Sequence, residues 1–266
     1  MMAQGLHVEV FGEGADPLVL LPGGGVRDPI YIGDVRTWQT TRPVAVVHYR
    51  GTPASGGLPR PWWDQFDDLE EVRRRLALDV VDLVAHSSGS RVALAYAASD
   101  APVRRIALIT PPATWLTGSE DDIAELVAKR PHTPPLAAAL LAPPLSLTSE
   151  ETFREHQELT APLGYASWTD DAQNHSRTGS TDIAALRAFF GAPPPAELLP
   201  HIRSLAIPIH VIAGAEDLLS GYRPVLELAA TFTRGTVETI EGSGHYPWID
   251  QPTAFAAALE AWVRNA

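Results

Sequence analysis

Short apolar runs recur along the chain, and segments with helical character separate them. In the first part of the chain these runs lie at residues 18–22, 44–49, 80–86 and 103–110. Each run is nearly continuous in apolar residues, which is typical of strands buried on both faces of a parallel sheet. Strands that alternate with helices at such spacing form right-handed βαβ units. The pattern therefore predicts an α/β fold with a mainly parallel sheet.

The segments around these strands complete the pattern. Residues 64–78 place acidic side chains early and arginines late, as a helix dipole favours. Residues 88–99 predict a helix of small residues close to the sheet. Apolar and polar residues alternate at 6–11, which predicts a further strand. Towards the end of the chain the sequence predicts strands at 207–214 and 235–242 and helices at 222–232 and 252–265.

The alternation breaks between residues 113 and 200, where proline clusters such as RPHTPP and APPP separate helical stretches. A structureless loop of this length is uncommon inside a compact domain. The segment therefore predicts a helical cap inserted into the α/β core. We expect residues 1–112 and 201–266 to form the core and residues 113–200 to form the cap.

Charge and composition narrow the class of protein. The 266 residues include 32 acidic and 20 basic side chains, a net charge of -12, and so acidic a surface repels nucleic-acid phosphates and anionic lipids. The absence of cysteine excludes disulfides, thiolate catalysis and cysteine-bound zinc. No apolar run reaches the roughly 18 residues that span a bilayer, and the first residues lack the features of a secretory signal. We expect a cytoplasmic monomer or homodimer that acts on a small molecule, without nucleic acid, membrane, metal or cofactor.

The stretch LVAHSSGSR, at residues 83–91, joins a predicted strand to a predicted helix through two adjacent serines. A sharp strand-to-helix turn that displays a nucleophile needs small residues two positions before and after it. Ser87 meets this condition with Ala85 and Gly89, whereas Ser88 has a histidine two positions before it. The alternative interpretation is that one of these serines only caps the following helix.

A serine nucleophile needs a general base, usually a histidine, that is oriented by a carboxylate. Asp217 follows a predicted buried strand, and His245 lies in a glycine-rich loop after the next strand. Parallel strands end at one edge of the sheet, so both loops share that edge with Ser87. Glu216 and Asp250 are competing candidates for the acid. We expect the other histidines to have structural roles. The chain order Ser–Asp–His is typical of the α/β-hydrolase arrangement.

Residues 22–26, with the sequence PGGGV, form a second candidate functional loop. Glycines allow a backbone to approach a substrate without a Cβ in the way. The loop lacks the Gly-Lys-Ser/Thr ending of a phosphate-binding loop and the spacing of a dinucleotide fingerprint, so nucleotide binding is disfavoured. An ordinary glycine turn is the alternative.

Together the motifs LLPGGG, HYRGTPAS, AHSSGS, GAED and GSGHYPW resemble those of the α/β-hydrolase superfamily. Within it the chain is most similar to the proline iminopeptidase-like branch with a helical cap. The resemblance implies a mostly parallel sheet flanked by helices, and we expect it to lack the usual first strand, because one strand-like run precedes residue 18. It implies Ser87 as the nucleophile, His245 as the base and Asp217 as the residue that orients the base.

The resemblance also implies an oxyanion hole made by the backbone N–H groups of Ser88 and Gly24, with Gly25 as the alternative donor. The cap acids match no role in holding a substrate amine, as a prolyl aminopeptidase requires. The chain departs from the common family pattern at Pro22, Val26, His48, Pro53, Ala85 and Ser90.

The implied chemistry is acyl transfer to water through an acyl-Ser87 intermediate, with an ester, thioester, lactone or amide as the cleaved bond. We expect a small, mostly apolar substrate in contact with Gly25, Tyr31, Trp115 and Trp168. One alternative is a non-hydrolytic enzyme, such as a lyase, a C–C-cleaving enzyme or an acyltransferase, that uses the same triad. The other is a ligand-binding protein with a vestigial triad.

Overall fold

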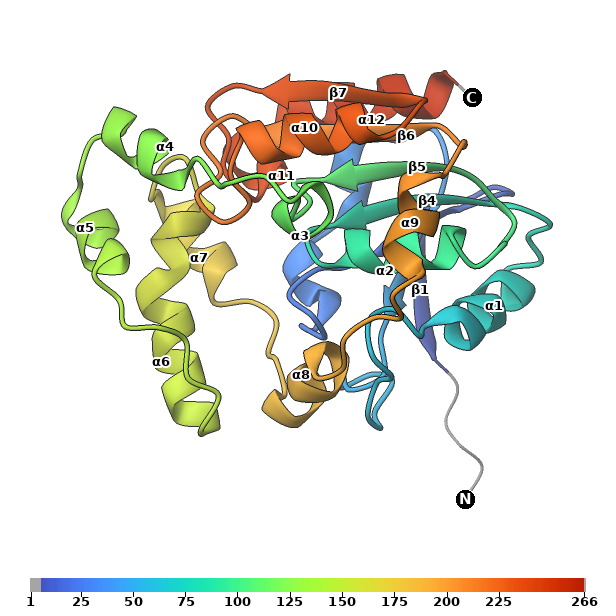
Figure 1. Ribbon diagram of the computed structural model, residues 1–266, viewed down its shortest axis with the longest axis horizontal. Helices are drawn as coiled ribbons and strands as arrows, with labels where there is room; N and C mark the ends of the chain where they lie inside the picture. The colour runs from blue at the N-terminus through green and yellow to red at the C-terminus, as the bar shows by residue number, and fades with distance from the viewer. Residues whose placement is uncertain (1–5, 266) are drawn as a thin grey trace.

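The computed structural model describes residues 6–265, and a seven-stranded sheet lies at its centre (Figure 1). The strands follow the spatial order β1-β3-β2-β4-β5-β6-β7. β1 pairs with β3 in the antiparallel direction, and the other pairings in the sheet are parallel. The strands are β1 (His7–Phe11), β2 (Leu18–Leu21), β3 (Val44–His48), β4 (Val81–His86), β5 (Val103–Ile109), β6 (Ile209–Gly214) and β7 (Gly235–Ile240).

Helices cover both faces of this sheet. Those of the core are α1 (Phe66–Arg75), α2 (Gly89–Ala97), α10 (Arg223–Thr231), α11 (Pro247–Asp250) and α12 (Pro252–Arg264). Between β5 and β6 the chain forms α3 (Thr114–Thr117), α4 (Ile123–Lys129), α5 (Pro134–Leu140), α6 (Glu150–Thr160), α7 (Asp170–Ser176), α8 (Ile183–Phe190) and α9 (Leu198–Arg203). Short 3-10 helices are η1 (Pro29–Ile32), η2 (Val35–Trp38) and η3 (Ala161–Gly164).

Alternate residues of the buried strands face opposite sides of the sheet, which explains the two layers of helices. Val19 and Leu21 of β2 belong to one buried cluster, which also contains residues of α1, α2 and α10. Leu18 and Leu20 point to the other face, where their cluster includes residues of α12. Successive residues of a strand point to opposite faces, so an apolar run such as LVLL requires a cover on both sides. The predicted α/β architecture is confirmed.

The two 3-10 helices between β2 and β3 are elements that the sequence analysis does not predict. Asp28 caps η1, because its carboxylate accepts the N–H of Ile30 at 3.3 Å. Asp34 caps η2 in the same way, with a 3.0 Å bond from the N–H of Arg36. Tyr31 of η1 is buried, and its hydroxyl accepts the N–H of Gly23 in the glycine-rich loop.

The helices between β5 and β6 divide into two groups. Figure 1 shows α4 to α7, coloured green to yellow, gathered beside the sheet, whereas α3, α8 and α9 lie against the core. Leu186 and Phe189 of α8 and Ile202 of α9 are buried in the same cluster as α2. The division into a core and a cap at residues 113–200 stays a prediction. None of the helices in residues 6–265 combines the length and the apolarity needed to cross a membrane.

Candidate active site

Ser87 lies in a sharp turn between β4 and α2, with a backbone φ of 50°. Residues other than glycine rarely adopt positive φ, so the surroundings must hold this turn. The Ser87 N–H donates to the Ile109 carbonyl at 2.9 Å. A Cβ on Gly89 would lie 2.4 Å from the Leu21 carbonyl oxygen, and one on Gly23 would lie 2.7 Å from the Ser87 Cβ. Close packing of the serine turn against the glycine-rich loop therefore requires glycine at position 89 after the turn and at position 23 in the loop.

Asp217 and His245 are brought together from two loops at the carboxyl ends of β6 and β7. Oδ2 of Asp217 lies 2.8 Å from Nδ1 of His245, and the two side chains are 1% and 6% exposed. Oδ1 of Asp217 accepts the backbone N–H groups of Leu219 and Ser220 at 2.8 and 3.1 Å. Since Asp217 holds a proton on Nδ1, the lone pair of a neutral imidazole lies on Nε2.

Ser87 lies at the same edge of the sheet as this pair. The residue before it, His86, contacts His245 directly: their ring centroids are 5.0 Å apart, and Nε2 of His86 lies 3.1 Å from the His245 carbonyl oxygen. Among the described residues, the Ser87 hydroxyl makes no hydrogen bond with the His245 ring. Such bonds are often long without substrate and tighten in the reactive complex. The structure therefore brings together the acid and the base and places Ser87 one residue from a contact with the base loop.

Two backbone N–H groups beside Ser87 have the properties of oxyanion donors. Within residues 6–265, neither the Gly24 nor the Ser88 N–H donates to another group in the protein. The Gly25 N–H, by contrast, donates to the Ser88 hydroxyl at 2.8 Å. Gly24 and Gly25 both have positive φ, of 69° and 68°, which turns successive amides of the loop in different directions. This arrangement favours Gly24 over Gly25.

A buried chain of hydrogen bonds joins the glycine-rich loop, the serine turn and the histidine loop. The Tyr31 hydroxyl accepts the Gly23 N–H at 2.6 Å and lies 2.8 Å from Nδ1 of His86. Burial holds the pKa of His86 well below its usual range and raises the pKa of Tyr31, so both groups are neutral. Tyr31 therefore donates to Nδ1 of His86, and Nε2–H of His86 donates to the His245 carbonyl.

Asp250 connects the histidine loop to the segment that follows η3. Its Oδ2 accepts the N–H of Gly244 at 2.8 Å and that of Ala166 at 3.0 Å. The His245 N–H also donates to the Gly164 carbonyl at 2.8 Å. Burial raises the pKa of Asp250 to about 6, although the two N–H bonds act in the opposite direction. Asp250, a competing candidate for the acid, thus braces the backbone of the loop and does not contact the imidazole.

Glu216, the other competing acid, points to a different partner. Its carboxylate lies 3.7 Å from Nε of Arg130, which comes from the segment after α4. Arg130 also donates to the carbonyls of Tyr165 and Ala166 at 2.7 and 2.6 Å. The Arg130 side chain is 9% exposed, so this guanidinium packs between the acid loop and the segment that follows η3. Sequence patterns did not indicate these contacts, because Tyr165 and Glu216 lie 35 and 86 residues from Arg130 along the chain.

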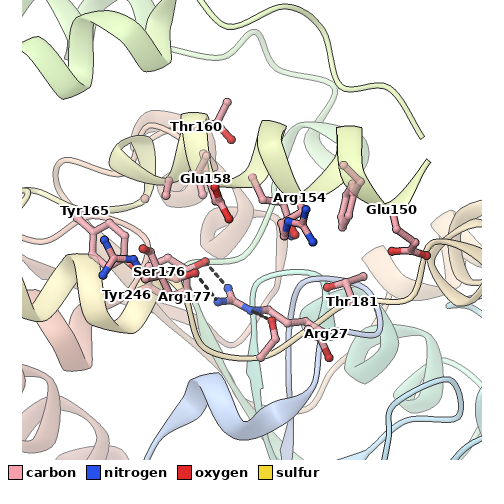
Figure 2. Close-up of a pocket in the computed structure, with 17 residues that line it drawn as sticks. Arg27, Glu150, Arg154, Glu158, Thr160, Tyr165, Ser176, Arg177, Thr181 and Tyr246 are labelled. Carbon is pink, nitrogen blue, oxygen red and sulfur yellow. Dashed lines mark hydrogen bonds between the residues drawn. The ribbon is translucent and has the colours of Figure 1, made fainter. Parts of the chain in front are cut away.

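A cavity of about 480 Å³ lies beside these loops, between the inserted helices and the core (Figure 2). Tyr246 and Leu219, from the histidine and acid loops, line it, whereas Ser87 and His245 do not. Arg27, which follows the glycine-rich loop, forms part of the floor. It donates to the Thr178 carbonyl at 3.1 Å from Nε and to the Tyr246 hydroxyl at 3.2 Å from Nη1.

Charged side chains distinguish this cavity from the apolar pocket that the sequence predicts. Figure 2 shows Arg154 and Glu158 pointing from α6 towards Arg27. Glu150 and Arg177 also line the cavity. The space therefore offers both signs of charge to a small molecule.

The residues predicted to contact the substrate lie elsewhere. Tyr31 is 1% exposed and belongs to the buried hydrogen-bond chain. Trp115 packs edge-on against Trp62 with centroids 5.3 Å apart, and Trp168 packs on Tyr165 with centroids 5.5 Å apart. Gly25 faces Leu186 of α8, which a Cβ would approach to 2.5 Å. None of the four lines the cavity of Figure 2, and their contact with a substrate stays a prediction.

Residues 18–258 match the alpha/beta hydrolase family, and the chain belongs to that family. The match includes Ser87, Asp217 and His245 and the strands that precede them. The fold class that the sequence predicts is confirmed by this match and by the sheet. The proline iminopeptidase-like branch is not distinguished by it.

Solved structures with the same fold align over nearly the whole chain. An esterase from Rhodococcus sp. ECU1013 superposes with a TM-score of 0.73 and 18% identity, covering 97% of this chain and 94% of that one. An aryl esterase described as putative, from Burkholderia cenocepacia, gives a TM-score of 0.70 and 18% identity over 98% and 94% of the two chains. An esterase from Exiguobacterium antarcticum gives 0.68 and 18% over 97% and 95%. The search of curated proteins found no match.

Proposed function

We propose that this protein is a serine hydrolase that cleaves a carboxylic ester through a covalent acyl-serine intermediate. The observation that carries the proposal is the buried 2.8 Å contact between Asp217 and His245, at the sheet edge where Ser87 occupies a strained turn. A carboxylate fixed by two backbone N–H groups orients the imidazole and stabilises its protonated form. Family membership and neighbours described as esterases support ester hydrolysis.

In the proposed reaction, Nε2 of His245 takes the hydroxyl proton of Ser87 while Oγ forms a bond to the ester carbonyl carbon. The tetrahedral intermediate collapses, its C–O bond to the alcohol breaks, and the imidazolium gives its proton to the leaving oxygen. Water then attacks the acyl carbon and loses a proton to His245. The carboxylic acid leaves as the proton returns to Ser87 Oγ, which restores the enzyme.

The N–H groups of Gly24 and Ser88 would stabilise the oxyanion in both tetrahedral intermediates. Each lacks another acceptor among the described residues, so neither has to break a bond to the protein first. A donor of this kind typically contributes about 2.7–4 kcal/mol to the lowering of the barrier.

The cavity supports a substrate with a polar or charged end, in place of a mostly apolar one. Arg27, Arg154 and Arg177 line it together with two glutamates. The substrate class remains broad: an ester or a lactone suits the neighbours, one of which is described as degrading N-acyl homoserine lactone.

A second candidate function is aminopeptidase activity, because Glu150 and Glu158 of α6 could bind a free substrate amine in the cavity. One oxygen of Glu150 already accepts the Ile183 N–H at 2.9 Å, and the arginines nearby oppose a cationic substrate. Proline p-nitroanilide and p-nitrophenyl acetate separate the two functions. We expect turnover of the ester to exceed turnover of the anilide by orders of magnitude.

The proposed nucleophile is tested by labelling the full chain with a fluorophosphonate and measuring the intact mass. We expect one adduct per chain, located on Ser87 by peptide mapping, and ester hydrolysis that stops with labelling. Ser87→Ala should abolish both. Ser90→Ala, which removes a neighbouring buried hydroxyl, is the matched control and should keep both. Labelling that persists in Ser87→Ala would contradict the proposal.

Product analysis separates hydrolysis from the non-hydrolytic alternatives. In H₂¹⁸O, hydrolysis places one ¹⁸O atom in the carboxylic acid, because water attacks the acyl carbon. Acyl transfer to another acceptor leaves the acid unlabelled and gives a new ester or amide. A folded protein that binds esters without forming either product would instead support a ligand-binding role.

A further inference from the structure

We propose that His7, Glu9 and His48 form a binding site for a divalent transition-metal ion of the zinc type. The three residues lie on β1 and β3, at the edge of the sheet where β1 is the last strand. The site does not depend on the proposed hydrolase function, because none of its residues belongs to the serine, acid or histidine loops.

The antiparallel pairing of β1 with β3 brings the three side chains together. His7 and His48 are direct partners across the two strands, and Glu9 follows His7 by two residues. Residues two apart in a strand share a face, and directly opposed residues share that face as well. The two imidazole rings touch edge-on with centroids 4.7 Å apart. Nε2 of His48 lies 3.9 Å from a carboxylate oxygen of Glu9. One ligand atom from each residue lies within 4.8 Å of the other two.

Small side-chain rotations would close these atoms around an ion. Zinc binds imidazole nitrogen and carboxylate oxygen at about 2.0–2.2 Å, so ligand atoms around a tetrahedral ion are about 3.3 Å apart. His48 is the fixed ligand, with a side chain that is 10% exposed, whereas Glu9 is 53% exposed and free to rotate. Ser55 holds the backbone in place: it accepts the His7 N–H at 2.9 Å and donates to the His48 carbonyl at 2.5 Å.

The donor set selects the metal. Two imidazoles and one carboxylate suit Zn²⁺, Ni²⁺ and Cu²⁺, whereas Mg²⁺ and Ca²⁺ prefer sites built from oxygen alone. Water would complete the coordination. Binding through Nε2 leaves the proton of His48 on Nδ1, which is buried and has no partner among the described residues. Loss of such an outer hydrogen bond typically lowers metal affinity about 10- to 100-fold, so we expect micromolar affinity.

Isothermal titration calorimetry of the full chain without an affinity tag tests the site. We expect one Zn²⁺ per chain, and a melting temperature that rises by a few degrees with Zn²⁺ and not with Mg²⁺, because the ion binds only the paired strands. His7→Ala and Glu9→Gln should each weaken binding at least about tenfold. Both residues are exposed, so the variants should fold, and circular dichroism checks that they do.

His201→Ala, which removes an exposed histidine on α9, is the matched control and should bind zinc as the unchanged protein does. Equal zinc affinity in His7→Ala and in the unchanged protein would overturn the proposal. So would the absence of binding at about 1 mM zinc, which corresponds to a binding free energy weaker than about −4 kcal/mol. Fluorophosphonate labelling should be the same in all these variants, which separates this result from the test of Ser87.

Discussion

Two buried aspartates lie at opposite ends of the strands and have different partners. Asp82, near the start of β4, is 0% exposed and is surrounded by arginines. Its carboxylate lies 2.7 Å from Nε of Arg104 and 3.1 Å from Nη2 of Arg105, and it also binds Arg42. Asp217, after β6, is 1% exposed and contacts two backbone N–H groups and an imidazole.

The difference between these carboxylates lies in what their partners can do with a proton. A guanidinium has donors and no acceptor, and it stays protonated in proteins. The guanidiniums around Asp82 therefore cannot take up a proton, and the role of the cluster is to join strands and helices. Arg105 shows this role, because it also donates to the carbonyl of Trp262 in α12 at 2.6 Å. The imidazole beside Asp217 can accept and release a proton, so the same residue type there supports chemistry.

Asp217→Asn has the largest expected effect on activity. Unchanged activity in this variant would contradict the catalytic role that distinguishes Asp217 from Asp82. An amide at this position presents N–H to Nδ1 of His245 and stabilises the wrong tautomer, so we expect kcat to fall about 10⁴-fold. Ester hydrolysis measures the loss, and circular dichroism checks the fold. Glu216→Gln, at the neighbouring half-exposed ion pair, should change kcat less than about fivefold. An equal loss of kcat in both variants would contradict the assignment of Asp217 as the residue that orients His245.

Asp82→Ala should instead lower stability and leave catalysis intact. The substitution leaves Arg105, which is 5% exposed on its side chain, without a carboxylate, and breaking a buried ion pair in this way costs about 3–5 kcal/mol. Urea denaturation measures the free energy of unfolding, and kcat per folded molecule should stay within about threefold. Asp79→Ala, at an exposed position three residues earlier, should change stability by less than about 0.5 kcal/mol. A loss of kcat in folded Asp82→Ala would show that the two ends of the sheet are coupled.

The smallest expected effect is on the pH dependence of stability, and it concerns Asp250. This third carboxylate accepts backbone N–H groups and is hydrogen-bonded neither to an arginine nor to an imidazole. Its pKa rises from 3.8 in the unfolded chain to about 6 in the fold, mainly because of burial. The folded protein therefore binds more protons between these values, so stability is highest below pH 4 for this group and falls as pH rises towards 6. The shift corresponds to at most about 3 kcal/mol.

Asp250→Asn keeps an oxygen for the Gly244 and Ala166 N–H groups and removes the titration. We therefore expect urea denaturation between pH 4 and 7 to show a flatter pH dependence in Asp250→Asn than in the unchanged protein. The same pH dependence in both proteins would mean that ionisation of Asp250 does not lower the free energy of unfolding. Asp82 acts oppositely: although burial alone would raise its pKa, the three arginines lower it overall, so its contribution is lost only in acid.

Local patterns were sufficient for most of the core. Nearly continuous apolar runs predict β2 to β6 within one or two residues, because a strand covered on both faces is apolar at most of its positions. The small residues around Ser87 and the glycines after β2 are also visible in the sequence, and the structure gives the reason: the two backbone segments approach to distances that exclude a Cβ. The short turns η1 and η2 were not predicted, because a single aspartate cap is a much weaker sequence signal than an apolar run.

The contacts that organise the site could not be predicted in the same way. Tyr31 follows the glycine-rich loop and suggests a pocket wall, yet it lies under the loop and bonds His86, 55 residues away. Arg130 and Glu216 are 86 residues apart and meet only because the inserted segment folds back on the acid loop. The charged lining of the cavity likewise combines side chains of α6 with Arg177, which follows α7, and Arg27, which precedes η1.

The sequence by itself determined the layered α/β core, the candidate nucleophile and base, and the order in which candidate serine, acid and histidine follow one another, because periodicity and turn chemistry act over a few residues. Only the tertiary structure decided which carboxylate faces the imidazole, which glycine amide is left without an acceptor, and which side chains surround the cavity. These are distances between segments far apart in the chain. They depend on how the strands and the inserted helices pack, which no local pattern encodes.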